Sequence, residues 1–399
     1  MSPFTFEPTL AAAQARLAAV DPRAYAATRN ALGGAVTRLS PYITHGLLSL
    51  REVYDAVHAR HPLHPQHKFV FELGWRAYWR HVWAHEGHDI HQSLHEGLLP
   101  EGEYQTHMPF DVLGACTGIP VVDLTVRDLY DTGYLHNHAR MWLASYLVHM
   151  RKVHWHTGAQ WMLGHLLDGD VASNHLSWQW VAGTGSSKPY LFNAENVAKY
   201  APEPYHSPGT VIDTSYETLD QIARSTTPAR QRGRNALASP AVEPPQLLTS
   251  PPGTAWSEPD SALASGRDVW LLHPWSIAAM PKNADGPSVL IGAALAECHA
   301  ETPWSERRWR FVTTGLQART QHLWWGNAAQ MAQALTGARS VRWQPDPHAD
   351  AALEQVAAML QVRPAAPSVL PQAEAPLFEP VERYCKSFSQ WWRQTKLLD

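Results

Sequence analysis

The sequence predicts a mainly helical first half and a doubly wound α/β fold in the last third, joined by a proline-rich connection. Apolar residues recur at helical spacing through most of the first 200 residues. After residue 268, strand-like apolar runs alternate with helical segments, a pattern typical of a parallel sheet with crossover helices. Between these parts proline, serine, threonine and alanine dominate. We therefore expect three regions: 1–203, 204–267 and 268–399.

Composition is that of an ordinary globular protein. The 399 residues are 45% hydrophobic and 17% charged, and no uninterrupted apolar run reaches the roughly 20 residues needed to span a bilayer. The start of the chain lacks a basic segment followed by an apolar block, so we expect no signal peptide. Three scattered cysteines, Cys116, Cys298 and Cys385, form no metal or disulfide pattern. These features predict a cytoplasmic protein without a membrane partner.

The net charge of −4 does not favour tight nonspecific binding to nucleic acid, because such binding depends on basic groups that release counterions from phosphates. It still allows one local basic face. The chain is unusual in having 18 tryptophans and 23 histidines.

The first helices carry recognisable start signals. Ser40 followed by Pro41 predicts an N-cap with proline at the first helical position, and the helix should end near His45. Ser49 with Glu52 forms a capping box for the next helix. Further helices are predicted from the apolar spacing in Phe69–Val82, Val121–Leu129 and His138–Met150.

After this region a single short helix, 216–224, is predicted within the otherwise extended or disordered connection. Strands are then predicted at 268–276, 287–297, 321–326 and 340–346. Helices are predicted between or after them at 304–320, 327–337 and 347–360. No glycine-rich dinucleotide or P-loop motif accompanies these strands.

The turn Thr37-Arg38-Leu39-Ser40 is the first candidate site. A hydroxyl-rich turn that opens a helix offers free backbone N–H groups and a favourable dipole to a phosphate. The same residues also fit a plain helix cap, and the sequence leaves both interpretations open.

Glu72, Trp75 and Arg76 are the second candidate, because their spacing places them on one helix face. A carboxylate, an indole and a guanidinium can together hold a stacked base or ring. The alternative is an ion pair between Glu72 and Arg76 beside a tryptophan of the core.

Asp168, Asp170 and Asn174 are the third candidate. A carboxylate can accept an N–H from a heterocycle, and an asparagine can both donate and accept. Two carboxylates also fit a metal site, but no further acidic ligand lies nearby in the sequence, so no metal is predicted. Glycosidase-like acid catalysis is conceivable for such a pair, although no other feature supports it.

Trp178 and Trp180 are the fourth candidate. They fit core packing, or else stacking on a base, which contributes roughly 1–3 kcal/mol per base, or an electron relay.

Five histidines follow one another at spacings of three to four residues: His81, His85, His88, His91 and His95. Such spacing can place several imidazoles on one helix face as metal ligands. Because Gly87 and Asp89 interrupt the helix, we predict a solvated histidine-rich face.

In this order and spacing, the motifs resemble the FAD-binding helical domain of the photolyase/cryptochrome family. The matching stretches are TRLSPYITHGLLS (37–49), ELGWRAYWR (72–80), TGIPVVDLTVRDLYDTGYLHNHARM (117–141), LLDGDVASN (166–174) and WQW (178–180). They cover about residues 20–200 and are highly specific. The resemblance implies an α-helical domain with FAD as its cofactor.

The resemblance also implies individual roles. Residues expected along the FAD phosphate and ribose are Tyr25, Thr37, Arg38, Leu39 and Ser40. Arg140 would pair with Asp168 beside the flavin, Asp170 would meet N3–H or the ribityl region, and Asn174 would face N5. Residues expected around a flipped-out pyrimidine dimer are Glu72, Trp75, Asn137, Met141 and Trp180. Arg76 and Asn137 count among the cofactor-binding residues, and Trp178 and Trp155 would begin a photoreduction chain.

Domain order departs from the family, whose usual members place the α/β domain first and the FAD domain last. Here residues 304–320 resemble the family's arginine-rich helix, and residues 377–396 resemble its segment beginning Leu-Phe-Glu-Pro. We therefore expect a circularly permuted photolyase-like protein, in which the proline-rich stretch is the new connection.

The resemblance implies light-driven electron transfer from reduced FAD to a pyrimidine dimer in DNA, and thus a photolyase-like lyase. Three departures instead favour a cryptochrome-like photoreceptor or an FAD-binding protein without repair activity. His138 stands where arginine is common, the stretch 188–193 is shortened, and 109–116 lacks a relay tryptophan. No four-cysteine iron–sulfur pattern occurs. The lesion, any antenna chromophore and the oligomeric state stay open.

Overall fold

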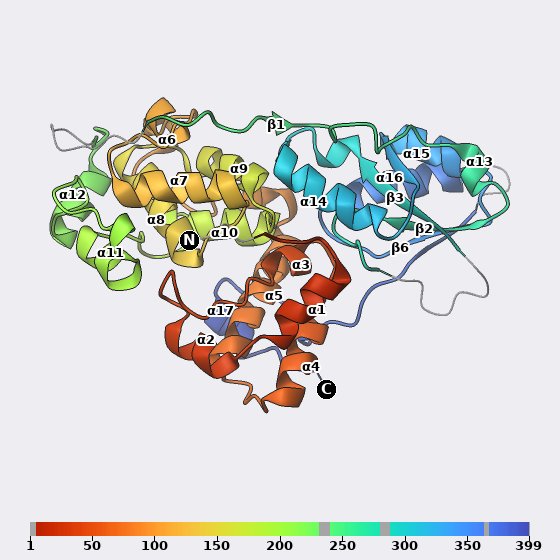
Figure 1. Cartoon of the computed structure of the whole chain (residues 1–399), viewed down its shortest axis with the longest axis horizontal. Coiled ribbons are helices and arrows are strands. Elements are labelled where there is room, and N and C mark those ends of the chain that lie inside the picture. The colour runs from red at the N-terminus through yellow and green to blue at the C-terminus, as the bar shows by residue number, and fades with distance from the viewer. Residues whose placement is uncertain (1–4, 231–239, 280–287, 363–366, 399) are drawn as a thin grey trace.

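The structure is a computed structural model that describes residues 5–230, 240–279, 288–362 and 367–398. It consists of a large helical part and an α/β part that lie side by side along the long axis of the molecule (Figure 1). Residues 231–239 of the predicted connection lie outside the described residues.

The helical part confirms the helices predicted from apolar spacing. Its α-helices are α1 (Leu10–Ala18), α2 (Pro22–Thr28), α3 (Ser40–Thr44), α4 (Leu50–Arg60), α5 (Lys68–Glu86), α6 (Phe110–Leu113), α7 (Pro120–Thr132), α8 (Asn137–Ser145), α9 (Trp155–His165), α10 (Val171–Ala182), α11 (Ala194–Tyr200) and α12 (Tyr216–Arg224). Shorter turns are η1 (Gly87–His91), η2 (Glu101–Glu103), η4 (Glu203–Tyr205) and the π-helical η3 (Tyr146–Met150), which extends α8.

The helix starts confirm one capping prediction and correct another. Ser49 and Glu52 form the predicted capping box at the start of α4. The prediction that Ser40 caps α3 is wrong, because Leu39 occupies the N-cap and makes no side-chain capping bond. The Ser40 hydroxyl instead donates to Oδ2 of Asp168 at 2.5 Å, which draws the start of α3 toward the centre of the helical part.

The α/β part contains one parallel sheet of five strands in the order β5-β3-β2-β6-β7. The strands are β2 (Asp268–Leu272), β3 (Val289–Leu295), β5 (Leu323–Gly326), β6 (Ser340–Trp343) and β7 (Ser368–Pro371). The helices that follow them include α14 (Glu306–Gln317), α15 (Ala328–Leu335) and α16 (Asp350–Gln361). Counted from β2, the order is 3-2-1-4-5, which is that of a doubly wound fold. The predicted fold class is therefore confirmed, although β7 was not predicted.

The proline-rich connection runs along the top of the molecule from the helical part to the α/β part (Figure 1). It carries β1 (Leu247–Leu248), which pairs antiparallel with β4 (Trp304–Ser305), and the short helix α13 (Ser261–Ala264). The connection is therefore held against the start of α14 by a two-residue ladder.

The last segment of the chain returns from the α/β part to the helical part. Its helix α17 (Phe388–Trp392) packs against α5, where the ring of Phe388 stacks on Trp75 with centroids 4.1 Å apart. Gly74 permits the approach, because a Cβ there would lie 2.4 Å from the ring of Trp392. Figure 1 shows α17 beside α2 and α5.

Buried polar groups join the two parts. The guanidinium of Arg308, on α14, donates to the carbonyl oxygens of Leu163 and Gly169 at 2.9 and 2.6 Å. It also lies 3.9 Å from the ring centroid of Trp304, where a cation–π contact forms. Burial lowers the pKa of Arg308 to about 9. The loop before α10 is thus fixed from the α/β side. None of the described helices has the length and apolar character needed to cross a lipid bilayer.

Candidate functional site

Two adjoining cavities open in the helical part. One, of about 480 Å³, lies between α5, α8 and α10, and the other, of about 240 Å³, lies between α2, the turn before α3 and α5. Residues common to the walls of both are Arg29, Asn30, Glu72, Arg76, Asn137 and His138. Because the cavities share walls, they form one continuous cleft with two ends.

The cleft brings together nearly all the site residues predicted from the sequence. The larger cavity is lined by Glu72, Trp75, Arg76, Asn137, Arg140, Met141, Asp168, Asp170, Asn174, Trp178 and Trp180. The smaller is lined by Tyr25, Thr37, Arg38, Leu39 and Ser40. Trp155 is among the lining residues of neither cavity and is buried in α9. The segments that supply these residues are separated by more than 100 positions, so only the fold could unite them.

Asp168 and Arg140, which both line the larger cavity, form an ion pair. A terminal nitrogen of Arg140 donates to both carboxylate oxygens of Asp168 at 2.9 and 2.7 Å. Ser40 supplies the further hydrogen bond to Asp168, and Nε of Arg140 donates to the Leu135 carbonyl at 3.0 Å. The predicted pairing of Arg140 with Asp168 is confirmed. Its partners fix both side chains in the wall of the cleft.

Asp170 is held by guanidinium groups, and its expected contact with the flavin stays a prediction. Its carboxylate is fully buried and accepts a hydrogen bond from Arg80 at 2.5 Å, with Arg76 at 3.6 Å. It also caps α10 by accepting from the backbone N–H of Ser173 at 2.8 Å. Although burial opposes the charge, Arg80 and Arg76 hold the pKa of Asp170 far below its usual range. Asp170 therefore stays ionised, and its main partner is a guanidinium.

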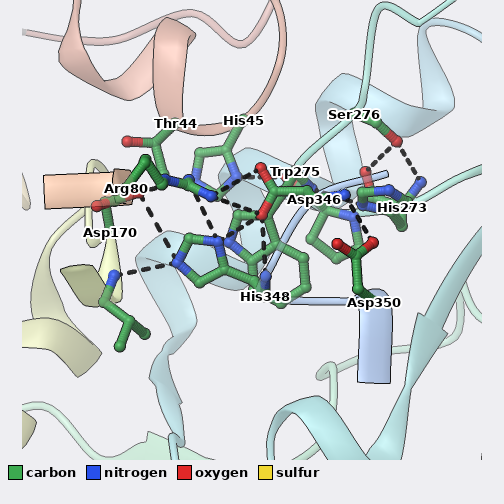
Figure 2. Close-up of polar contacts among 12 residues, drawn as sticks. Thr44, His45, Arg80, Asp170, His273, Trp275, Ser276, Asp346, His348 and Asp350 are labelled. Atoms are coloured by element: carbon green, nitrogen blue, oxygen red, sulfur yellow. Dashed lines mark hydrogen bonds and ion pairs between the residues drawn. The ribbon is translucent and has the colours of Figure 1, made fainter. Parts of the chain in front are cut away.

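The network around Asp170 reaches into the α/β part. Figure 2 shows Arg80 between Asp170 on one side and Asp346 with His348 on the other. Arg80 lies 3.3 Å from both oxygens of Asp346, which in turn lies 2.6 Å from Nδ1 of His348. Nε2 of His348 accepts the backbone N–H of Val171 at 3.0 Å. Since Nε2 accepts and Nδ1 donates, His348 is neutral, in line with the way burial lowers its pKa.

Glu72 pairs across the cleft and not along its own helix. It lies 3.0 Å from Arg29 of the chain after α2, so the alternative of a Glu72–Arg76 ion pair is wrong. Arg76 points away from it and donates to Oγ1 of Thr44 at 2.8 Å. Burial raises the pKa of Glu72, while Arg29 lowers it. Glu72 belongs to the wall that both cavities share.

Asn174 and Trp178 lie one helical turn apart on α10, and both line the larger cavity. Nδ2 of Asn174 donates to the Ala159 carbonyl at 2.9 Å, which fixes the amide and leaves its oxygen as an acceptor. The ring of Trp178 packs against Gly158 of α9. Trp155 lies three residues before Gly158, about one turn along the same helix. Trp178 therefore contacts α9 about one turn away from Trp155, the other predicted member of the relay.

Replacing Gly158 by alanine should lower the free energy of unfolding by about 1–3 kcal/mol, because overpacking a filled core forces side chains to move. A Cβ at this position would lie 2.4 Å from the ring of Trp178. Urea unfolding followed by circular dichroism measures the change. Gly102→Ala is the control, since a Cβ at Gly102 meets nothing within 4 Å. Equal stability of the two variants would contradict the packing described for Trp178.

An aromatic wall borders the open side of the larger cavity. Trp180 is 38% exposed and lies beside Tyr190, with ring centroids 5.7 Å apart. Trp75 contributes from α5, and its ring centroid lies 5.2 Å from that of Trp79. An exposed indole next to buried charges gives this end both a stacking surface and polar partners.

Sequence reasoning missed several lining residues, among them Arg29, Asn30, Trp79, Ser173 and Ser177. A signal existed for Trp79, which follows Trp75 by four positions and so shares its helix face. A weaker one existed for the two serines, which flank Asn174 on α10. No comparable signal marked Arg29, because it lies in an irregular stretch far from α5 in the sequence.

The prediction of a solvated histidine-rich face holds for only part of the run. His88 is exposed, but His91 is partly buried and lies near two histidines from other helices, His156 and His175. The physical reason is the turn η1, which ends α5 and directs His91 inward. Residues so distant in sequence could not be grouped by spacing.

Comparison with known proteins identifies the helical part. A family model described as the FAD binding domain of DNA photolyase matches residues 69–212. This segment is similar to that FAD-binding domain. It contains α8 to α10 and thus most of the larger cavity.

Proteins similar to this chain include a deoxyribodipyrimidine photo-lyase and a cryptochrome DASH. A deoxyribodipyrimidine photo-lyase from Streptomyces griseus is 36% identical over 154 residues, covering 39% of this chain and 33% of that protein. A cryptochrome DASH from Gloeobacter violaceus is 34% identical over 172 residues, covering 41% of this chain and 34% of that protein. The chain therefore spans about a third of the length of these relatives. The solved Synechocystis cryptochrome aligns with a TM-score of 0.46 and 26% identity, covering 57% of this chain and 54% of that one.

Proposed function

We propose that this chain binds FAD in the cleft and uses blue light to transfer an electron from reduced flavin to a pyrimidine dimer in DNA. The observation that carries this proposal is the arrangement of the cleft around Arg140 and Asp168. The larger cavity holds this pair together with the aromatic rings of Trp75 and Trp180, and the smaller cavity, which shares walls with it, adds the hydroxyls of Thr37 and Ser40. Such a cleft fits a long cofactor whose phosphates lie at the polar end and whose ring system meets a flat substrate at the aromatic end.

The donor set of the cleft fits a flavin. FAD, when bound, supplies the light absorption and the transferable electron, while the protein supplies position and electrostatics. Arg140 brings a fixed positive charge beside the ring system, and Asp168 keeps that charge oriented. Asn174 offers an amide oxygen whose orientation is set by the bond from Nδ2 to Ala159, which suits an N–H donor such as N5–H of a reduced flavin. Asp170 assists less directly, through the charges of Arg76 and Arg80.

The polar end suits the phosphates and ribose. Thr37 and Ser40 supply hydroxyls, and Tyr25 closes one wall. Arg38 adopts a positive φ of 52°, a conformation that costs energy for a residue with a Cβ and that often marks a functional turn. Because α3 has only five residues, we assign phosphate binding mainly to these side chains, to backbone N–H groups and to the nearby Arg29, and not to the dipole of α3.

The aromatic end suits a dimer that has left the duplex. Extruding a base costs a few kcal/mol, and less when the base is damaged. Trp75 and Trp180 would stack on the extruded lesion, Glu72 would hydrogen-bond it, and Asn137 and Met141 would complete the pocket. Asn137 and Met141 are already in contact, since Nδ2 of Asn137 lies 3.3 Å from the Met141 sulfur.

The relay supports photoreduction of the flavin. Trp178 lines the cavity beside Asn174, and Trp155 lies behind it in α9. Nε1 of Trp155 donates to Oγ of Ser93 at 2.9 Å, so this indole has a polar partner that can stabilise positive charge developing on the ring. We propose that electrons reach the flavin through these two indoles.

A cryptochrome-like photoreceptor without repair activity is the second candidate. The net charge of −4 and His138, which lies on the wall of the cleft, favour it over a DNA-binding enzyme. The short stretch 188–193 also follows α10 directly, close to the open aromatic end. Under this proposal the flavin is photoreduced while DNA is bound weakly or not at all.

The strand order supports a circular permutation. We infer that 1–203 form the FAD domain and that 204–267 are the new connection. Residues 268–399 would correspond to the α/β domain that usual family members place first, with the exception of the last segment, whose helix α17 packs against α5 of the helical part. The buried hydrogen bonds from Arg308 to Leu163 and Gly169 hold the α/β part against the helical part, close to the proposed cofactor site. The three free cysteines suit a reducing compartment, so we infer a cytoplasmic location.

Replacing Trp180 by alanine should weaken binding of a dimer-containing oligonucleotide about 5- to 150-fold, because stacking on an aromatic ring contributes roughly 1–3 kcal/mol per base. Fluorescence anisotropy with a labelled oligonucleotide measures the affinity at fixed salt. Phe110→Ala is the control, because Phe110 is 91% exposed and lies outside the lining of the cleft. Unchanged affinity in the Trp180 variant would favour the photoreceptor proposal.

A further inference from the structure

Three histidines from separate elements converge beside the proposed relay. His91 ends η1, His156 lies in the first turn of α9, and His175 lies in the middle of α10. One ring nitrogen of each lies within 4.8 Å of the corresponding nitrogens of the other two. Their ring centroids are 4.9 to 5.8 Å apart. No residue of this cluster lines the cleft described above.

One ring nitrogen of His175 is buried without a hydrogen-bond partner among the described residues. Its side chain is fully buried, and Nδ1 lies 3.2 Å from the carbonyl oxygen of Val171, so Nδ1 carries the proton and donates. Nε2 is also buried and has no hydrogen-bond partner among the described residues. A buried acceptor without a partner costs roughly 1–3 kcal/mol. A ring that donates Nδ1–H to a carbonyl and presents a free Nε2 has the orientation typical of a metal-ligating histidine.

The charge state of the cluster suits a cation. The neutral imidazole is the form that binds metals, and a ring that donates from Nδ1 while its Nε2 has no partner, as in His175, is in that form. The carboxylate of Glu301 is close enough to raise the pKa of His91 and His156, so one negative charge faces the cluster from the α/β part.

We propose that His91, His156 and His175 bind a divalent transition-metal ion, with Zn²⁺ the best fit. Three imidazole nitrogens leave one tetrahedral position, which water can fill. Zn–N bonds of about 2.0–2.1 Å place ligand nitrogens about 3.3 Å apart in a tetrahedron. His91 and His156 are partly exposed, and small rotations of these two rings bring their nitrogens around the ion while His175 stays fixed.

The site adjoins Trp155. Its ring centroid lies 5.4 Å from that of His156 and 6.0 Å from that of His175. A bound ion would therefore place positive charge next to the second indole of the proposed relay and would fix η1 against α9 and α10. Metal binding itself does not depend on the proposed light-driven function.

The test is a Zn²⁺ titration of the full chain, carrying whatever flavin it retains, after treatment with a chelator. Competition with a chromophoric chelator at pH 7 gives stoichiometry and affinity. We expect one tight equivalent in the unmodified protein and at least tenfold weaker binding in His91→Asn and in His156→Asn, because even losing an outer partner of a ligand costs 10–100-fold. His107→Asn, at an exposed histidine outside the cluster, should bind as the unmodified protein does.

Two outcomes overturn the proposal: no stoichiometric Zn²⁺ binding by the unmodified protein, or equal affinity in both ligand variants and the His107 control. Circular dichroism checks that the variants fold. Should either unfold, Co²⁺ added to the unmodified protein decides the question. Intense visible absorption of four-coordinate cobalt supports the site, whereas the weak spectrum of hydrated Co²⁺ contradicts it. Zn²⁺ should also raise the Tm of the unmodified protein, because a ligand that binds only the folded state stabilises it.

Discussion

Replacing Arg80 by methionine should lower the free energy of unfolding by about 3–5 kcal/mol, the usual cost of breaking a buried ion pair from one side. Arg80 lies between the carboxylates of Asp170 and Asp346, at 2.5 and 3.3 Å (Figure 2). Asp170 is fully buried, and the Arg80 side chain is 23% exposed. Without the guanidinium, Asp170 keeps only the more distant Arg76 as a positive partner, so two carboxylates would share a poorly compensated site at the junction of the two parts.

The loss should depend on pH. Arg80 helps to hold the pKa of Asp170 and of Asp346 far below the usual value, which is about 3.9 for a free aspartate. A depressed folded-state pKa contributes stability above the unfolded pKa, and this contribution is lost as pH falls below about 4. The difference between the variant and the unmodified protein should therefore be largest near neutral pH and should shrink toward pH 3.

Urea unfolding at several pH values measures both effects. Arg310→Met is the matched control, because Arg310 is 70% exposed and forms an ion pair with the exposed Glu306. Surface pairs of this kind contribute at most about 1 kcal/mol. A loss in the Arg80 variant no larger than that in the control, at neutral pH, would contradict the network described between the two parts.

Replacing Trp178 by phenylalanine should slow photoreduction of the bound flavin at least tenfold. Trp178 is the indole of the proposed relay that lines the cavity, and its ring is 3% exposed and packed against Gly158. Phenylalanine keeps an aromatic ring in this space but is harder to oxidise than tryptophan. The electron would then have to reach the flavin from Trp155 across a longer gap.

Absorption spectra recorded during blue illumination with an external reductant follow the photoreduction. Trp161→Phe is the control, because Trp161 is also buried in α9 but lies outside the lining of the cleft. Both variants lose a buried indole, so a difference between them reports the relay and not stability. Equal photoreduction in Trp178→Phe and the control would contradict the role assigned to Trp178.

Local signals in the sequence predicted most of the elements. The capping box of Ser49 and Glu52 depends on residues within one turn, and the structure confirms it. The alternation of strands and helices after residue 268 likewise needs no distant partner, and it gave the doubly wound class. Strand β7 was not predicted, because it is a short edge strand with mostly exposed residues and a proline and therefore contains no apolar run.

The site was predictable only as a set of residues that resembled a family, and not as a network. The expected contact of Asp170 with the flavin stays a prediction, but its partner Arg80 and the approach of His348 from the α/β part were not predicted. The stacking of Phe388 on Trp75 joins residues more than 300 positions apart. The approach of His348 and the stacking of Phe388 leave no periodic signal, because both depend on how the last third of the chain packs against the helices.

The most direct test of the account is illumination of the purified, reduced protein together with an oligonucleotide that contains a pyrimidine dimer. The account predicts that the protein carries FAD and that the dimer disappears in blue light but not in the dark, measured by chromatography of the oligonucleotide. If FAD is bound and photoreduced while the dimer persists, the repair function is contradicted and the photoreceptor proposal takes its place. If FAD neither copurifies nor can be loaded, the assignment of the cleft itself is contradicted.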